Sequence, residues 1–211
     1  MIKAILFDMD GVLIDAKEWH YEALNMALGL FGYEISRADH IHSYDGLPTR
    51  DKLNLISERS NLPYTLHDFI NVLKQKYTME IINQRCSPIF EHEYALSRLR
   101  SEGYKIAVCS NSIRKTIEKM MEKAELIDYF DVIMSNEDVK KAKPDPEIYV
   151  KTMEKLHLQP KDCLILEDNK NGIIAARASG GYLLQIDTVY DVNYSNIISR
   201  IKEIEEGGDQ L

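Results

Sequence analysis

The sequence predicts an α/β protein in which an open parallel sheet carries an α-helical domain inserted after its first strand. Three observations predict this fold class. The 211 residues suit one domain with a smaller insertion. Five short apolar runs have the composition of buried parallel strands, and the later runs alternate with segments of helical period. Roughly 95 residues separate the first two runs, far more than a single crossover helix needs.

The strands are expected where short runs of leucine and β-branched residues are bounded by polar residues. They are predicted at residues 2–7, 104–109, 131–134, 163–166 and 182–186. The segments between the later strands have the apolar spacing of amphipathic helices. These helices are predicted at residues 112–123, 145–156 and 172–178. Strand alternating with helix implies right-handed crossovers and a parallel sheet.

The long insertion is almost entirely helical in pattern and predicts a cap domain. We expect the cap to span residues 16–83 and the catalytic core to consist of residues 1–15 and 84–211. One apolar stripe marks the first cap helix, which Gly32 is expected to end. The stripe consists of Trp19, Ala23, Leu24, Ala27, Leu28 and Phe31. Further cap helices are predicted at 49–57 and 66–79, and fraying is expected only at 205–211.

Composition limits the partners that the chain can have. The 34 acidic and 26 basic side chains give a formal charge of −8, which argues against binding to nucleic acid or to an anionic membrane surface. No apolar run is long enough to span a bilayer, and no signal peptide is expected. Three widely spaced cysteines without metal-like spacing favour the cytoplasm. We expect a monomer with a small-molecule substrate.

Polar residues follow the predicted strands at the end of the sheet where open α/β proteins bind their ligands. The set consists of Asp8, Asp10, Ser110, Asn111, Lys143, Glu167 and Asp168. Asp8 and Asp10 lie where the alternation of the strand stops, so both carboxylates can face one cavity. Gly11 supplies the sharp turn that this arrangement requires.

Four carboxylates in one cavity would repel one another unless a cation lay among them. Their oxygen atoms suit a hard dication, and magnesium is the natural choice. Ser110 and Lys143 would then hold the remaining oxygens of a phosphate group. Lys140 and Lys141 compete with Lys143 for this role, and the neighbouring Pro144 favours Lys143. Ser112 is the better candidate for an N-cap of the following helix.

The run from Asp8 to Asp15, with the sequence Asp-Met-Asp-Gly-Val-Leu-Ile-Asp, resembles the first motif of the haloacid dehalogenase-like hydrolases. Ser110 resembles the second motif, Lys143 the third, and Glu167 with Asp168 the fourth. The helical insertion resembles the branch with an α-helical cap, which includes β-phosphoglucomutase and phosphoglycolate phosphatase. The resemblance implies a Rossmann-like core, a magnesium cofactor and an aspartyl-phosphate intermediate. It therefore implies a phosphatase acting on a small phosphomonoester, such as a sugar phosphate.

The resemblance also implies a role for each residue of the core. Asp8 would be the nucleophile and a magnesium ligand. Asp10 would be the general acid and base and would also bind magnesium through its carbonyl. Asp168 would bind the metal through its side chain, and Glu167 would be an outer-shell or water-mediated ligand. The core residues assigned to the phosphoryl group and the substrate are Ser110, Lys143 and Asn111.

The cap is expected to contact the part of the substrate beyond the phosphoryl group. The turn at Gly46 resembles the specificity loop of this branch, and Arg50 would bind a second anionic group. His20 matches a position where relatives have a histidine or an acid facing the active site. For Arg50 a solvated helix face, and for His20 simple helix packing, remain alternatives. His40 and His42 share one side of a segment but lack a third metal ligand.

Two other classes of function remain open. A phosphomutase of the β-phosphoglucomutase type needs the same residues but must protect its aspartyl phosphate from water. Ala16 stands where the family usually has serine or threonine, which argues against the mutase. A non-catalytic phospho-aspartate module or binding module is the third class. An inactive relative would have lost Asp8, Asp10, Lys143 or Asp168, and all four are present.

Overall fold

The computed structural model describes residues 1–207 and contains a parallel sheet with the strand order β3-β2-β1-β4-β5. The strands are β1 Ala4–Phe7, β2 Lys105–Cys109, β3 Val132–Met134, β4 Cys163–Glu167 and β5 Tyr182–Gln185. Every one overlaps a strand that the sequence predicts. The central strand β1 pairs with β2 on one side and with β4 on the other. The predicted α/β class with a parallel sheet is confirmed.

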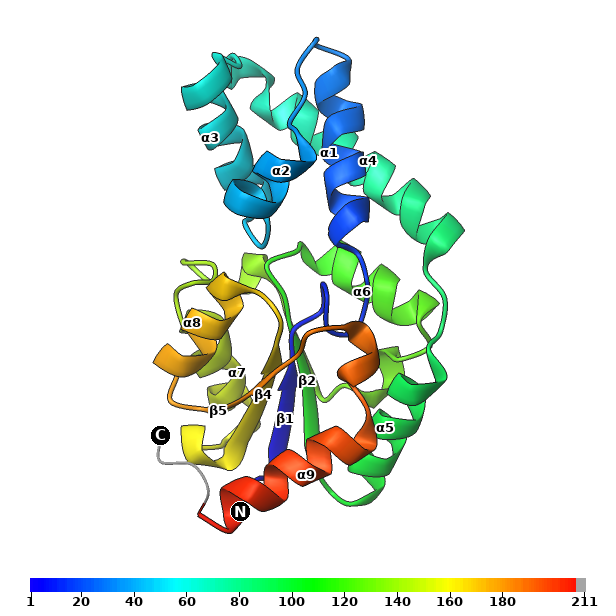
Figure 1. The fold of residues 1–211 in the computed structure, drawn as a ribbon, viewed down its shortest axis with the longest axis vertical. Helices are drawn as coiled ribbons and strands as arrows, with labels where there is room; N and C mark the ends of the chain where they lie inside the picture. Colours follow the sequence, from blue (N-terminus) through cyan, green and yellow to red (C-terminus); the bar gives the residue numbers. More distant parts are fainter. Residues whose placement is uncertain (208–211) are drawn as a thin grey trace.

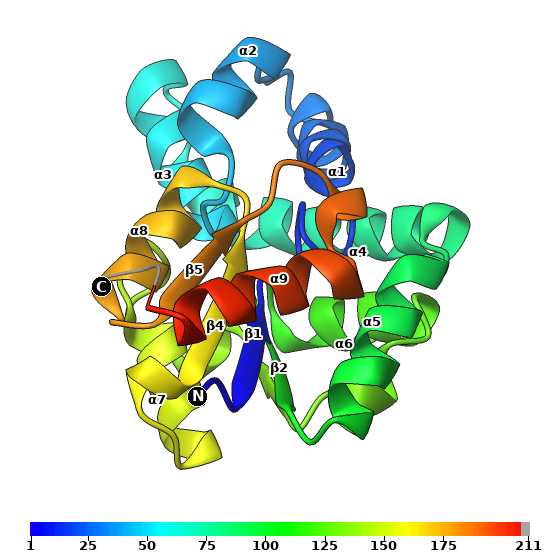
Figure 2. The same ribbon diagram turned by 60° about the horizontal axis from the view of Figure 1, so that its bottom comes forward.

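Helices cover both faces of the sheet, as expected for strands that are apolar on both sides. They are α5 Phe90–Ser101, α6 Arg114–Lys123, α7 Glu147–Leu156, α8 Lys170–Ala178 and α9 Tyr194–Glu205. Figure 2 shows α9 crossing one face of the sheet beside α5. The sequence patterns predicted α6, α7 and α8 but neither α5 nor α9.

Two apolar cores lie on the two faces of the sheet. The alternation of β1 divides its side chains between them: Ile5 and Phe7 face one core, and Ala4 and Leu6 face the other. All four side chains are fully buried. Burial of each large apolar side chain contributes about 1.5–3 kcal/mol, so β1 is held firmly on both faces. The residues that follow β1 therefore start from a fixed position.

A separate layer of helices lies over the carboxyl end of the sheet (Figure 1). It contains α1 Lys17–Gly29, α2 Arg37–Asp39, α3 Thr49–Ser60 and α4 His67–Arg85. The layer has its own apolar core, formed by Leu24, Ala27, Leu28, Ile35, Tyr44, Leu53, Ile56, Leu62 and Ile70. We propose that residues 16–83 of this layer form the cap, with the end of α4 leading back to the core.

Short 3₁₀ or π turns connect these elements. They are η1 His40–Tyr44, η2 Tyr64–Leu66, η3 Ile127–Tyr129, η4 Asn136–Asp138, η5 Pro160–Asp162 and η6 Val189–Asp191. The three cysteines are free thiols. Within residues 1–207, every helix is too short or too polar to cross a membrane. The segment expected to fray, 205–211, lies mostly outside the described residues.

Candidate active site

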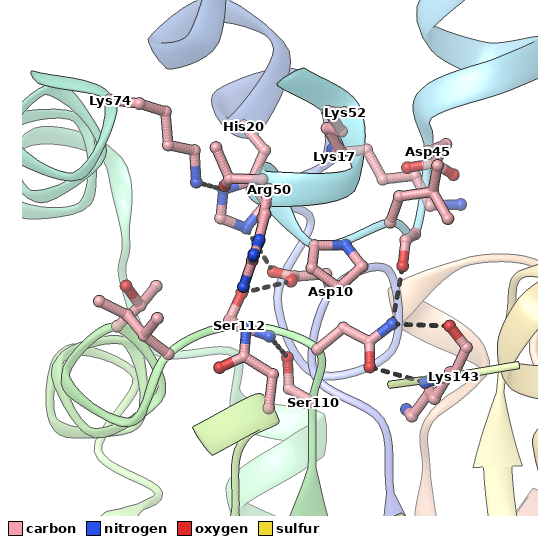
Figure 3. A pocket seen from close by; sticks show the side chains of 18 of the residues that line it. Asp10, Lys17, His20, Asp45, Arg50, Lys52, Lys74, Ser110, Ser112 and Lys143 are labelled. Atoms are coloured by element: carbon pink, nitrogen blue, oxygen red, sulfur yellow. Dashed lines mark hydrogen bonds and ion pairs between the residues drawn. The ribbon is translucent and has the colours of Figure 1, made fainter. Parts of the chain in front are cut away.

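The carboxyl ends of β1, β2 and β4 meet the cap at a cavity of about 160 Å³ (Figure 3). The chain leaves β1 through a tight loop in which the Gly11 amide donates to the carbonyl of Ile14. Gly11 has a φ of +91°, and a Cβ built on it would lie 2.0 Å from Oδ2 of Asp168. Only glycine satisfies both conditions, as the sequence suggested for this turn.

Lys143 joins two of the predicted carboxylates at the floor of the cavity. Its Nζ donates to Oδ1 of Asp8 at 2.6 Å, to Oε1 of Glu167 at 2.6 Å and to the carbonyl of Cys109 at 2.7 Å. Asp8, Glu167 and Lys143 are all buried. The hydroxyl of Tyr149 also donates to Oε1 of Glu167, and the Tyr149 ring lies 4.8 Å from the Lys143 ammonium. Lys140 and Lys141, the competing lysines, are exposed.

The charges in this cluster alter each other's protonation. Burial lowers the pKa of Lys143, but attraction to Asp8 and Glu167 outweighs burial and leaves that pKa raised. Burial, followed by repulsion from Glu167, raises the pKa of Asp8 well above its usual range, and Lys143 only partly opposes this. The cluster therefore carries more negative charge than Lys143 balances, and a further cation would stabilise the ionised form of Asp8.

The arrangement of acidic oxygens fits such a cation. Asp8, Glu167 and Asp168 each offer a carboxylate oxygen, and these oxygens lie within 4.8 Å of one another. Lys17 already places its ammonium 2.6 Å from Oδ2 of Asp168. An all-oxygen donor set of carboxylates is the chemistry of a site for a hard dication, so these residues fit magnesium.

Asp10 belongs to a different network, although it follows Asp8 by two residues. His20 Nε2 lies 3.1 Å from Oδ1 of Asp10, and the Ser112 hydroxyl donates to Oδ2 at 3.2 Å. Lys74 Nζ lies 3.2 Å from the other ring nitrogen of His20. An ammonium can only donate, so a neutral His20 accepts at Nδ1 and donates at Nε2 to Asp10. Figure 3 shows this chain of contacts descending from the cap.

The pKa values of Asp10, His20 and Lys74 are all lowered. Burial acts to raise the pKa of Asp10, but His20, Lys74 and Ser112 together lower it below the usual range. Burial lowers the pKa of His20, with Asp10 acting in the opposite direction. Burial and the neighbouring Lys52 lower the pKa of Lys74 to about 7. Asp10 is therefore ionised and His20 neutral at neutral pH.

Ser110 and Ser112 follow β2, and both line the cavity. The Ser110 hydroxyl is buried, lines the cavity and accepts from the Ser112 amide at 3.0 Å. Ser112 does not cap the next helix as the sequence suggested: α6 begins at Arg114, Ile113 is its N-cap residue, and Glu137 accepts from the Arg114 amide at 2.7 Å. The Ser112 hydroxyl donates to Asp10 instead.

Asn111 connects the cap loop to the core. Its Nδ2 donates to the carbonyls of Gly46 at 2.9 Å and Lys143 at 3.3 Å, and its Oδ1 accepts from the Lys143 amide at 3.1 Å. Gly46 has a φ of +72°, and a Cβ there would lie 2.9 Å from Oδ1 of Asn169. The loop thus comes close to the core through a glycine. The substrate contacts predicted for Asn111 and Gly46 remain predictions.

The cap side of the cavity carries basic side chains. Arg50 is exposed but extends from the cap toward the cavity (Figure 3), and Lys52 and Lys74 are buried beside it. Within residues 1–207, no carboxylate lies within ion-pair distance of Lys52 or Lys74. The sequence patterns predicted no role for either lysine. Lys52 lies four residues from the buried Ile56, and Lys74 lies four residues from the buried Ile70, so helical spacing places each lysine on the apolar side of its helix. This spacing does not show whether the ammonium faces a cavity or solvent.

The profile of the haloacid dehalogenase-like hydrolase family matches residues 5–185, which is most of the chain. The chain belongs to the haloacid dehalogenase-like hydrolases. This confirms the family and the kind of enzyme that the four motifs predicted. Among curated members, a phosphorylated carbohydrates phosphatase of Thermotoga maritima is 28% identical over 197 residues, which cover 92% of this chain and 87% of that protein.

Two further members of the family are similar over nearly the whole chain. A phosphoglycolate phosphatase of Aquifex aeolicus is 30% identical over 179 residues, covering 85% of this chain and 82% of that protein. The crystal structure of a β-phosphoglucomutase from Clostridium difficile superimposes with a TM-score of 0.84 at 24% identity, covering 97% of this chain and 99% of that one. The shared fold confirms the predicted Rossmann-like sheet with a helical cap.

Proposed function

We propose that this haloacid dehalogenase-like hydrolase is a magnesium-dependent phosphatase that hydrolyses a small phosphomonoester through an aspartyl phosphate on Asp8. The observation that carries the proposal is the buried cluster in which Lys143 contacts both Asp8 and Glu167, with Asp168 within ligand distance. A carboxylate that faces a cavity beside a fixed ammonium can attack phosphorus while the ammonium neutralises the phosphoryl oxygens. The three free cysteines support a cytoplasmic location.

Each carboxylate of the cavity would have its own part in the reaction. Oδ2 of Asp8, the oxygen not bound by Lys143, would attack the phosphoryl group and release the leaving oxygen. Asp10, which is ionised in the free enzyme, would first take up a proton from solvent and give it to the leaving oxygen, and would later take a proton from the water that hydrolyses the aspartyl phosphate. His20 and Ser112 each hold one oxygen of Asp10, which fixes the orientation of the carboxyl group.

Magnesium would be held by Asp8 and Asp168, with Glu167 behind them, and would neutralise charge on the phosphoryl oxygens. The Asp10 carboxylate points away from these oxygens toward His20, so a contact of Asp10 with the metal would use its main-chain carbonyl. Ser110 would donate its hydroxyl to a phosphoryl oxygen, because its hydroxyl lies at the cavity and accepts from the Ser112 amide. Phosphate monoesters react so slowly in water that no single group suffices.

The cap supports a substrate with a second anionic group. Arg50, Lys52 and Lys74 line one side of a cavity whose volume of about 160 Å³ suits a small metabolite. Among the described residues, neither buried lysine has a carboxylate as a close partner. An anionic group of the substrate would supply this missing negative charge. The names of the relatives, which are phosphatases of phosphorylated carbohydrates and of phosphoglycolate, support a substrate of this size.

A phosphomutase is the alternative that the fold supports, because the β-phosphoglucomutase shares the same architecture. At 24% identity that likeness concerns the fold alone. Ala16 argues against the mutase: it is the N-cap residue of α1 and, as an alanine, offers no side-chain hydrogen bond to the start of this helix. A serine or threonine at this hinge could make such a hydrogen bond, and this chain cannot.

The test is the release of inorganic phosphate from a panel of sugar monophosphates, sugar bisphosphates, phosphoglycolate and nucleotides, with and without magnesium. We expect magnesium-dependent release that is fastest for small substrates with a second anionic group. Asp8→Asn, which fills the same space but cannot attack, is the matched control. Conversion of one hexose phosphate isomer into another without release of phosphate would establish the mutase instead. Release from no substrate would overturn the proposal.

A further inference from the structure

Lys17 is a cation of the cavity to which the proposed reaction assigns no role. It is the first residue of α1, and its ammonium lies 2.6 Å from Oδ2 of Asp168. The side chain of Asp168 is 1% exposed, whereas that of Lys17 is 38% exposed. A Cβ built on Gly11 would lie 2.0 Å from Oδ2 of Asp168 and 2.7 Å from Cε of Lys17. The pair is therefore packed directly against the main chain of Gly11.

The other groups around Lys17 hold the ammonium in place. Asp45 of the cap and Asp8 of the core attract it in addition to Asp168. The second oxygen of Asp168 accepts a long hydrogen bond of 3.3 Å from the side-chain amide of Asn169. Among residues 1–207, Lys17 is thus the cation in ion-pair contact with Asp168, as Lys143 is for Asp8 and Glu167.

Asp168 is also one of the carboxylates that would bind magnesium. The Lys17 ammonium lies 2.6 Å from Asp168, so it would compete with a divalent cation for the same carboxylate. The two positive charges would also repel each other. Lys143 cannot withdraw readily, because its side chain is 2% exposed and makes three hydrogen bonds. Lys17 can withdraw, because its side chain reaches the solvent and its helix begins at the link between core and cap.

We propose that Lys17 is an internal competitor of the metal ion: its ammonium holds Asp168 in the metal-free enzyme and weakens the binding of magnesium. This inference rests on the proposed function, which places magnesium at Asp8 and Asp168. Lys17 keeps the buried carboxylate paired while no metal is bound, and metal binding displaces the ammonium toward solvent. Because Lys17 belongs to the cap and Asp168 to the core, binding of the metal also breaks one contact between them.

The test is isothermal titration of the metal-free full-length protein with magnesium at constant ionic strength. Lys17→Met keeps the length of the side chain and removes its charge, and we expect it to bind magnesium about tenfold more tightly than the wild type. Lys17→Arg retains the charge and should bind as the wild type does. Lys161→Met is the matched control, because Lys161 is an exposed lysine at the opposite end of β4. It should leave the affinity unchanged.

Thermal unfolding supplies a second measurement that does not depend on activity. Without metal, Lys17→Met leaves Asp168 buried and without its closest cation, so its Tm should be lower than that of the wild type. Saturating magnesium should raise the Tm of Lys17→Met by more than it raises that of the wild type or of Lys161→Met.

The outcomes separate the two proposals. Equal or weaker magnesium binding by Lys17→Met, with the wild type binding normally, would overturn the role of Lys17 and leave the phosphatase proposal intact. Absence of magnesium binding in the wild type, Lys17→Met and Lys161→Met alike would overturn the metal site and this inference together. Magnesium binding by Lys17→Met, with no binding by the wild type or Lys161→Met, would show that Lys17 excludes the metal completely and would support the inference.

Discussion

The two sides of the cavity balance their charges in opposite ways. On the core side the buried Lys143 has two carboxylate partners, Asp8 and Glu167, each at 2.6 Å. On the cap side Lys52 and Lys74 are equally buried, and among residues 1–207 neither has a carboxylate within ion-pair distance. Under the proposed function, the core side would be assembled before the substrate arrives, and the substrate would complete the cap side.

The pKa of a buried lysine is therefore shifted in opposite directions on the two sides. Burial lowers the pKa of all three lysines, but carboxylate partners reverse this for Lys143 alone. The pKa of Lys74 falls to about 7, and that of Lys52 is also lowered. A lysine that binds an anionic substrate gains the partner that it lacks, so substrate binding favours its charged form. Substitutions on the two sides test this distinction between core and cap.

Loss of the nucleophile should have the largest effect. Asp8→Asn retains the shape and two hydrogen-bonding atoms of the side chain but cannot attack phosphorus, so turnover should fall by roughly 10⁴-fold or more. The substrate should still bind, because the cap is unchanged. Phosphate release and substrate binding are measured on the same preparation. Turnover close to that of the wild type would exclude covalent catalysis by Asp8.

Removal of divalent metal should have the next largest effect, and it again concerns the core. Chelation should reduce turnover by roughly 10³-fold, because the charge on the phosphoryl oxygens is then neutralised by lysine alone. Magnesium should restore activity better than calcium, whose longer and looser coordination misplaces the phosphoryl group. Activity is measured after dialysis and metal addition. Undiminished activity in chelator would contradict a role for metal.

Substitutions on the cap should change selectivity rather than chemistry. Lys52→Met and Arg50→Ala should raise KM roughly 10- to 100-fold for substrates with a second anionic group. Hydrolysis of an aryl phosphate, which needs little of the cap, should change by less than about threefold. Lys76→Met is the matched control, because Lys76 lies on α4 but its side chain is 68% exposed. An equal loss for all substrates would place these residues in the phosphate site.

The smallest expected effect concerns the stability of the cap at acid pH. His40 is 2% exposed, and neither of its ring nitrogens has a hydrogen-bond partner in the part of the chain that the structure describes. Burial lowers its pKa from 6.5 to about 4. Between these pH values the unfolded chain binds a proton that the folded chain excludes, so stability falls as the pH drops from 6.5 to about 4. His40→Phe should lose less stability over this range than the wild type.

Thermal unfolding at pH 7 and pH 5 checks this difference. The lowered pKa values of His20 and His92 act in the same direction, so the variant should retain part of the pH dependence. His42→Phe, two residues further along and exposed, should behave as the wild type. An identical loss of stability in wild type and His40→Phe would show that His40 does not contribute.

The sequence predicted the core side of the site far better than the cap side. Asp8 and Lys143 follow buried strands, and parallel strands bring such residues together at one edge whatever the details of packing. Lys17, Lys52 and Lys74 were not predicted, because their positions depend on how the cap helices rest on the core. A lysine on a helix has the same local pattern whether it faces solvent or a cavity.

Two other omissions have different physical reasons. The helix α9 carries Ile197, Ile201 and Ile204 at helical spacing, and Asn193 caps its start, so a sufficient signal was present in the sequence. The helix α5 is highly charged and exposes Phe90 and Tyr94, and its buried apolar residues Ala95, Leu96 and Leu99 lie in a helix that packs against α9, which is remote in sequence. Ser112 similarly looked like a helix cap because the tertiary contact with Asp10 has no local signature.

The separate apolar core of the cap has a consequence for how such an enzyme can diversify. Leu24, Leu53 and Ile70 pack among themselves and do not belong to the two cores that flank the sheet. Substitutions at distant, independent sites have additive effects on stability. A lineage can therefore change the cap step by step without disturbing the packing around Asp8. New substrate ranges become accessible while the reaction itself is inherited intact.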